Sequence, residues 1–210
     1  MPTEDALPHS VAPWRVDPGR AALLIHNMQN HLIRAFSPGS SPRGELVGNI
    51  ARLRKAAGRL GIPVVFSTEP TPGSHRRGLA DRLPIGAGAG EGAEAGAGAD
   101  SDGHIVANLA PARGDHLVTN TRHNAFLGSH LGRILRTADR DQLIVCGLFA
   151  HSGVLLTAAD AFMNDIQPFV VADAVADLSA EEHELALRWS AARGAVVRTT
   201  TTLIKELDAR

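Results

Sequence analysis

Short apolar runs alternate with helical stretches along most of the chain. The runs are uninterrupted, which is typical of strands buried on both faces, and they lie at residues 21–26, 63–68, 116–120, 141–147, 169–174 and 195–199. Helices are expected at 45–60, 129–137, 151–164, 179–192 and 202–209. This order predicts an α/β fold, a three-layer α/β/α sandwich with a six-stranded parallel doubly wound sheet.

Two of these helices have boundaries marked by the sequence. The helix over 45–60 is followed by Gly61, which should end it because glycine accepts the left-handed cap conformation. Ser179 and Glu182 have the Ser-x-x-Glu spacing of a capping box. That spacing predicts the start of a helix running to about Ala192.

The ends of the predicted strands are where a ligand is expected. Doubly wound sheets bind ligands at the carboxyl ends of their strands, where the strand order reverses. The segments that follow the strands here are Asn27, Thr68 with Glu69, residues 120–123 and residues 148–154. We therefore expect the functional residues to lie in these segments.

The chain of 210 residues is expected to form one domain, 1–210, because its length suits a single full core,. Residues 1–13 are expected to be an N-terminal tail. Residues 86–103 are almost entirely Gly, Ala, Glu and Asp and show no apolar periodicity,. They are either a tolerated surface insertion or a lid over the strand ends.

Charge and cysteine content restrict the partners and the compartment. A net charge of -1 provides no basic field for nucleic acid or an anionic membrane,. No apolar run approaches the ~18 residues that span a bilayer, and the N-terminus does not resemble a secretory signal. We expect a cytoplasmic protein. Its one cysteine, Cys146, lies within an apolar run and is expected to be a buried structural residue,.

Several kinds of chemistry find no support in the sequence. No Gly-x-Gly-x-x-Gly follows the first strand, and no Gly-Lys-Ser/Thr loop occurs,. The ten histidines are scattered without a recognisable ligand spacing,, although His26, His123 and His151 could converge at the sheet edge. Ser152 lacks a Gly-x-Ser-x-Gly setting and is better explained as a helix cap or turn. We expect no cofactor and no metal.

Motifs along the chain resemble the isochorismatase-like (cysteine hydrolase-like) family. The segments that carry the resemblance are 14–29, 61–70, 77–79, 141–147, 150–153, 157–162, 165–166, 171–174 and 177–179. They resemble most the isochorismatases of siderophore and phenazine pathways. The resemblance implies the same sandwich fold, a small-molecule substrate with a carboxylated ring, and a homodimer. From the charge we expect no nucleic acid and no membrane partner,.

At the positions of the family's catalytic residues, this chain carries other residue types. The family uses an Asp, a Lys and a Cys, and the resemblance places Asn27, Asn120 and Val154 at those positions. An amide has no titratable proton in the useful range and cannot act as the general acid of vinyl ether hydrolysis. Val154 cannot attack a substrate. The usual mechanism is therefore expected to be absent or greatly weakened.

Two hypotheses follow for the activity. In the first, the protein is an enzyme of secondary metabolism with a rearranged acid–base set. Glu69, His123 and His151 would carry protons, and Asn27 and Asn120 would donate hydrogen bonds. In the second, it is an inactive family member that binds a metabolite or a protein partner. An enclosed Glu69 that faces Asn27 favours the enzyme, and a solvent-exposed Glu69 favours the inactive member.

A further group of residues is expected to bind the substrate. It comprises Gln29, Arg77, Arg122, Phe149, Ser152, Gly153 and Val154. By resemblance Arg77 holds the substrate carboxylate, for which a guanidinium has the right geometry, with surface ion pairing as the alternative. Arg122 could instead pair with a nearby acid, and His151 could instead orient its turn. The resemblance also predicts a cis non-proline peptide bond at Phe149–Ala150.

Overall fold

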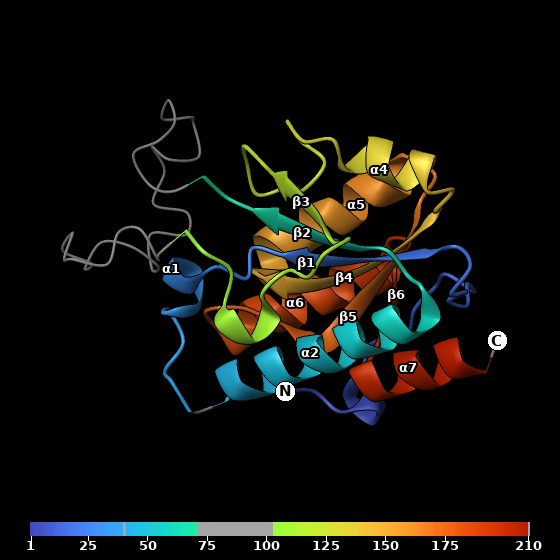
Figure 1. Cartoon of the computed structure of the whole chain (residues 1–210). Helices are drawn as coiled ribbons and strands as arrows, with labels where there is room; N and C mark the ends of the chain where they lie inside the picture. The colour runs from blue at the N-terminus through green and yellow to red at the C-terminus, as the bar shows by residue number, and fades with distance from the viewer. Residues whose placement is uncertain (40, 71–102, 210) are drawn as a thin grey trace.

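The computed structural model describes residues 1–39, 41–70 and 103–209, and its centre is one parallel sheet (Figure 1). The strands are β1 (Ala21–His26), β2 (Val64–Thr68), β3 (His116–Thr119), β4 (Gln142–Leu148), β5 (Gln167–Ala176) and β6 (Val196–Arg198). Their order is β3-β2-β1-β4-β5-β6, and every pair is parallel. The strand order reverses between β1 and β4, so the predicted doubly wound sheet is confirmed.

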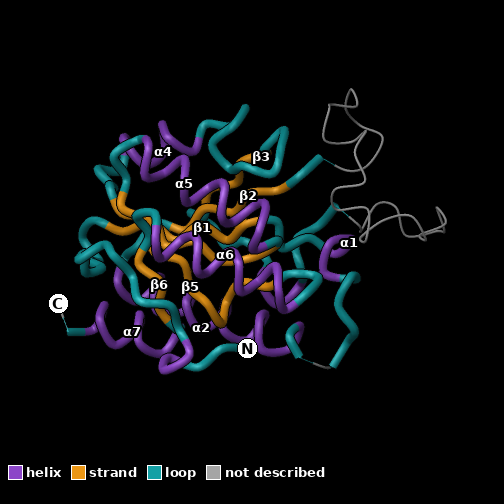
Figure 2. Tube along the Cα trace, turned by 180° about the vertical axis from the view of Figure 1, so that it is seen from behind, coloured by secondary structure: helices purple, strands orange, loops and turns teal. Residues whose placement is uncertain are grey.

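Helices cover both faces of this sheet. They are α1 (Asn30–Ile33), α2 (Arg43–Leu60), α4 (Leu131–Thr137), α5 (Leu155–Met163), α6 (Ala180–Ala192) and α7 (Thr200–Asp208). Short 3-10 turns occur at η1 (Glu4–Ala6) and η4 (Ala107–Leu109), and η5 (Ala150–Val154) is a π-helical turn. The view from behind in Figure 2 shows α6 in front of the sheet.

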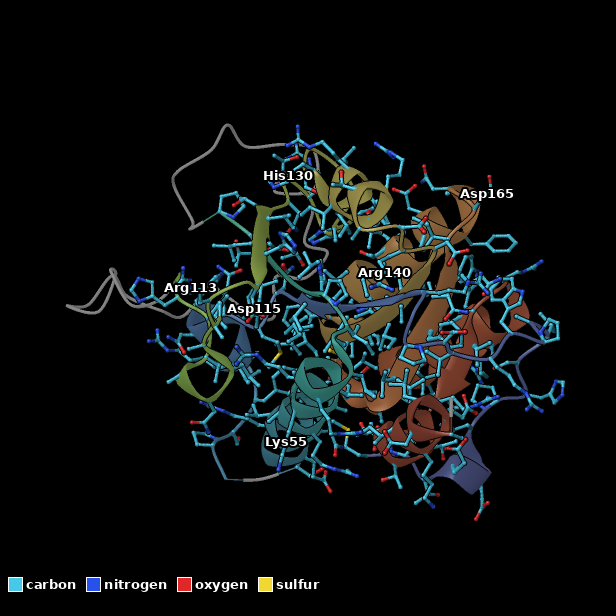
Figure 3. The ribbon with its side chains drawn as sticks, turned by 45° about the vertical axis from the view of Figure 1, so that its right-hand side comes forward. Lys55, Arg113, Asp115, His130, Arg140 and Asp165 are labelled. Atoms are coloured by element: carbon cyan, nitrogen blue, oxygen red, sulfur yellow. The ribbon has the colours of Figure 1, made fainter. Side chains whose placement is uncertain are left out.

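The core is divided by the sheet into two apolar clusters. Successive side chains of a strand point to opposite faces, so Leu23 and Leu24 belong to different clusters. One cluster packs under α2 and α7, and the other under α4, α5 and α6. Figure 3 shows Lys55 of α2 on one side of the sheet and His130, at the start of α4, on the other. Cys146 is fully buried in the first cluster, as expected.

Some elements differ from the sequence-based expectation. Helices α1 and η4 were not predicted, because each is too short to show a period. The predicted helix over 151–164 is instead the π-helical turn η5 followed by α5. Strand β5 is longer than predicted and extends to Ala176. The differences at η5 and β5 arise at element ends, where local periodicity carries little information.

The N-terminal segment is held against the far edge of the sheet. The Glu4 carboxylate accepts hydrogen bonds from the backbone N–H and the hydroxyl of Thr199, which is the N-cap of α7. The hydroxyl of Ser10 accepts from the N–H of Val197 in β6 at 2.9 Å. These contacts cover part of an edge strand that would otherwise present unpaired backbone groups.

No helix in the described ranges is long and apolar enough to cross a membrane. Apart from Gly103, the Gly/Ala-rich segment 86–103 lies outside the described residues.

The capping box at α6 gives a test of the fold. Ser179 Oγ accepts a hydrogen bond from the Glu182 N–H at 3.1 Å, so the predicted helix start is confirmed. Ser179→Ala should lower the free energy of unfolding by about 1 kcal/mol, because the first turn loses an acceptor. Ser179→Thr, which keeps a hydroxyl, is the matched control. Equal urea midpoints for both variants would contradict this role.

Candidate active site

The carboxyl ends of β1, β2 and β3 bring three polar residues to one end of the sheet, which we call the strand edge. Asn27 follows β1, Glu69 follows β2, and Asn120 follows β3. The ladder continues beyond the strands, because the Asn27 N–H donates to the Ser67 carbonyl at 2.9 Å and the Asn120 N–H to the Thr68 carbonyl at 3.0 Å. This edge lies on the same side as α1 (Figure 1).

Glu69 is the carboxylate at the centre of this edge. Its Oε1 accepts from Asn27 Nδ2 at 2.7 Å and lies 3.5 Å from His123 Nδ1. Its side chain is 26% exposed, whereas that of His123 is 42% exposed. Burial acts to raise the pKa of the Glu69 carboxyl, but the contact with His123 and its positive charge hold that pKa below the usual value,. Glu69 is therefore a partly enclosed carboxylate that faces Asn27.

Gln29 fixes the backbone of Glu69. Its Oε1 accepts from the Glu69 N–H at 2.7 Å, and its Nε2 donates to the carbonyls of Glu69 and Gly103, both at 3.0 Å. Both ends of this buried amide are thus used within the protein. Among the described residues, Gln29 positions Glu69, and its amide oxygen and nitrogen form hydrogen bonds with backbone groups.

Asn120 holds the segment that leads to His123. Its Nδ2 donates to the carbonyl of Arg122, and the residue is fully buried. The Arg122 guanidinium donates to the carbonyl of Thr121 at 2.6 Å. The ion pair expected as the alternative role of Arg122 is not found among the described residues. Asn124 continues the segment and donates to Asp160 of α5 at 2.6 Å.

His26 is a fully buried histidine beneath this edge. Its Nδ1 lies 2.6 Å from the hydroxyl of Ser67. Burial lowers the pKa of His26 to about 4, although the charge of Glu69 and the backbone of His123 oppose this decrease,. At neutral pH the ring is therefore uncharged. It packs against Gly153, where a Cβ atom would lie 2.4 Å from His26 Nε2.

The turn after β4 carries the remaining predicted residues. Ser152 and Gly153 lie in η5, and Val154 is buried in the core under α4, α5 and α6. The ring of Phe149 stacks on Phe36, with centroids 6.1 Å apart. The cis non-proline bond joins Leu148 to Phe149. The prediction of Phe149–Ala150 was wrong by one bond, because β4 extends to Leu148 and the turn starts at its last residue.

His151 is bound to a partner that the sequence did not identify. Its Nδ1 lies 2.7 Å from Asp177 Oδ2, which also accepts from the His151 N–H at 2.6 Å. The Asp177 side chain is fully buried. These bonds tie the turn after β4 to the segment after β5. The sequence marked both residues, but only their folded positions show them as a pair.

One group of described residues has the composition of a metal site. His151, Asp177 and Glu182 offer ligand atoms within 4.8 Å of one another. His151 and Asp177 already bond to each other, and Glu182 contacts the Ser179 hydroxyl at 3.2 Å. Hydrogen bonding and the cap of α6 therefore account for this cluster.

The predicted site residues thus fall into two groups. Asn27, Gln29 and His123 each contact Glu69 at the strand edge, and Asn120 supports the same edge from β3. His151 and Phe149 contact other partners, Asp177 and Phe36. Arg77 lies outside the described residues. Ser67 was not singled out, because its role depends on the ring of His26.

A doubly wound α/β domain with polar residues at the carboxyl ends of its strands belongs to a broad class of ligand-binding and hydrolytic folds. The isochorismatase domain model matches residues 21–202. The chain therefore belongs to the isochorismatase family, as its motifs indicated.

Individual relatives agree with this assignment. The phenazine biosynthesis protein PhzD of Pseudomonas fluorescens is 42% identical over 205 residues, which cover 97% of this chain and 94% of that protein. The isochorismatase of Bacillus subtilis is 42% identical over 208 residues, covering 99% of this chain and 64% of that protein. A cysteine hydrolase from Pseudomonas syringae shares the fold, with a TM-score of 0.79, 21% identity and coverage of 97% and 99% of the two chains.

The close approach of Gly153 to His26 gives a second test. Gly153→Ala should destabilise the protein by about 1–3 kcal/mol, because the new methyl group would overlap the ring,. The control is Gly58→Ala in α2, where a Cβ meets nothing within 4 Å. That substitution should stabilise by up to about 1 kcal/mol. Urea unfolding measures both, and an equal effect of the two would refute the packing argument.

The buried neutral His26 predicts a dependence of stability on pH. Because its pKa is about 4 in the folded protein and 6.5 when unperturbed, the unfolded chain binds more protons between these values,. Stability should therefore fall as the pH falls, by about 2 kcal/mol between pH 7 and pH 5 from this residue. When the free energy of unfolding is measured with urea at both pH values, His26→Asn should lack that part of the decrease. The same decrease in the variant would disprove the assignment.

Proposed function

We propose that this protein is a hydrolase of secondary metabolism that cleaves the vinyl ether of an isochorismate-like ring compound, with Glu69 and His123 as its acid–base pair. The observation that carries the proposal is the enclosed Glu69 carboxylate, 2.7 Å from Asn27 and 3.5 Å from His123. The relatives named isochorismatase and phenazine biosynthesis protein support the substrate class.

The two members of the pair would have different roles. The pKa of Glu69 is lowered, so Glu69 is a carboxylate at neutral pH and cannot give a proton itself. A carboxylate beside an imidazole stabilises the protonated ring. His123 is also the more exposed of the two side chains. His123 would therefore donate the proton, and Glu69 would keep the ring charged and oriented.

The reaction would begin with transfer of a proton from His123 to the methylene carbon of the vinyl ether. The electrons of the double bond form the new C–H bond and leave an oxocarbenium ion, which the Glu69 carboxylate stabilises. Water then adds to the cationic carbon, which bears the ether oxygen, and returns a proton to His123. As the hemiketal collapses, the bond to the ring oxygen breaks, the hydroxyl proton of the hemiketal passes to that oxygen, and pyruvate and the ring alcohol are released.

Asn27 and Asn120 would serve this scheme as neutral residues. By the family resemblance they occupy the positions of an acid and a lysine. Asn27 donates a hydrogen bond to Glu69, which favours the carboxylate form,. Asn120 holds the backbone of Arg122, one residue before His123. Neither amide would transfer a proton.

The proposal predicts release of pyruvate from isochorismate or its amino analogue. Glu69→Gln and His123→Gln should each lower kcat by about 10²–10⁴, the usual contribution of a positioned acid or base. Asn164→Ser, at the exposed end of α5, is the control and should keep full activity. Absence of pyruvate with the unmodified protein would reject vinyl ether hydrolysis.

A double variant tests the rival hypothesis that the protein is an inactive family member that only binds a ligand. Asn27→Asp combined with Asn120→Lys introduces the acid and the lysine of the family's set. Pyruvate from this variant, with none from the unmodified chain, would identify an inactive member with an intact pocket. Activity of the unmodified chain that depends on Glu69 would exclude it.

A further inference from the structure

The loop between β3 and α4 carries His123 and is bound to the helix α5. The Ala125 N–H donates to Thr157 Oγ1 at 3.0 Å, and Asn124 Nδ2 donates to Asp160 Oδ2 at 2.6 Å. Thr157 and Asp160 are three residues apart in α5, so their side chains lie on one face of the helix,. The two residues that directly follow His123 are therefore both attached to that face.

The backbone on the other side of His123 is fixed as well. The buried Asn120 amide donates to the carbonyl of Arg122, the residue directly before His123. Asn120 follows β3, and its N–H continues the hydrogen-bond ladder to β2. His123 thus lies between two attachments of its loop, one to the sheet and one to α5.

The contact of the loop with Thr157 is enclosed in the core. Thr157 and Ala125 are both fully buried, so water does not reach the hydrogen bond between them. A buried N–H group that loses its acceptor is unfavourable, and folded proteins keep few of them. Removal of the Thr157 hydroxyl should therefore displace this part of the loop.

Such a displacement would act on the contact between His123 and Glu69. His123 Nδ1 lies 3.5 Å from Glu69 Oε1, which is already long for a hydrogen bond. A misplacement of about 1 Å in a reacting group can lower a rate about 100-fold. The attachments to α5 are therefore placed where they control the geometry of the proposed acid–base pair.

We infer that Thr157 and Asp160 are positioning residues, which hold the loop after β3 so that His123 stays against Glu69. The inference rests on the proposed function for the reaction that this pair performs. The hydroxyl and the carboxylate of α5 act through the loop and do not touch the substrate. This role also explains part of the motif 157–162, which the acid–base scheme by itself leaves unused.

Paired substitutions at Thr157 test this role in pyruvate release by the full chain. Thr157→Val keeps the shape of the side chain and removes the hydroxyl, so kcat should fall about tenfold to 100-fold while KM changes by about twofold or less. Thr157→Ser keeps the hydroxyl and should retain kcat within about twofold. An unchanged kcat in the valine variant, an effect on KM alone, or an equal loss in both variants would overturn the inference.

Asp160 provides a second pair of variants. Asp160→Asn keeps an oxygen that accepts from Asn124, whereas Asp160→Ala does not,. Only the alanine variant should therefore lose kcat, and equal activity of the two would contradict the role of Asp160. Asn164→Ser is the matched control, because Asn164 binds the other carboxylate oxygen, Oδ1, and its loss leaves the contact with Asn124 in place.

Nuclear magnetic resonance of the histidine rings tests the positioning without turnover. Glu69→Gln should shift the ring nitrogen signals of His123, which are assigned with His123→Gln, because a neighbouring charge is removed. In the Thr157→Val background the same substitution should shift them by about half as much or less, since the two groups have moved apart. The Thr157→Ser background should keep the full shift. Equal shifts in both backgrounds would refute the inference, and the Asp160 pair decides in the same way if a Thr157 variant does not fold.

The kinetic and resonance experiments separate the inference from the proposed function. Ring shifts that depend on Thr157, without pyruvate release by the unmodified chain, would reject the hydrolase proposal and support the attachment of His123 through α5. Pyruvate release, with ring shifts that are the same in every Thr157 background, would support the hydrolase and reject the role given to α5.

Discussion

The hydrogen bond from Asn27 to the Glu69 carboxylate is the contact on which the strand edge depends. Asn27 leaves β1 with a φ of 52°, in the left-handed region that asparagine tolerates better than most residues,. The bond places the carboxylate between β1 and β3 and turns the amide oxygen away from it. One interaction therefore sets both the position of the charge and the polarity of its neighbour.

The layer beneath this edge is uncharged at neutral pH, whereas the edge itself is charged. His26 is buried and neutral, packed between Ser67 and Gly153. Glu69 lies closer to solvent, with its carboxylate 3.5 Å from His123 Nδ1, and is charged at neutral pH. A low-polarity layer under a charged group strengthens its electrostatic interactions relative to water. The glycine is needed at this point because any side chain would displace the histidine.

The family and the chemistry depend on different parts of the molecule. The fold is set by the sheet and its two apolar clusters. The proposed chemistry depends on a few side chains after β1, β2 and β3, where a single oxygen or nitrogen changes what can be transferred. Family membership therefore supports the substrate class, while the roles of Glu69, His123 and the amides need their own tests.

The sequence by itself determined the strands, the doubly wound order and the segments that meet at the site, because these follow from local periodicity and from rules of chain connection. It also indicated that Glu69 and Asn27 could meet. Only the tertiary structure decided that Gln29 clamps the backbone of Glu69, that His151 belongs to Asp177, and that the cis bond precedes Phe149. These features depend on contacts between residues far apart in the chain, and no local pattern encodes which polar atoms will face each other after folding.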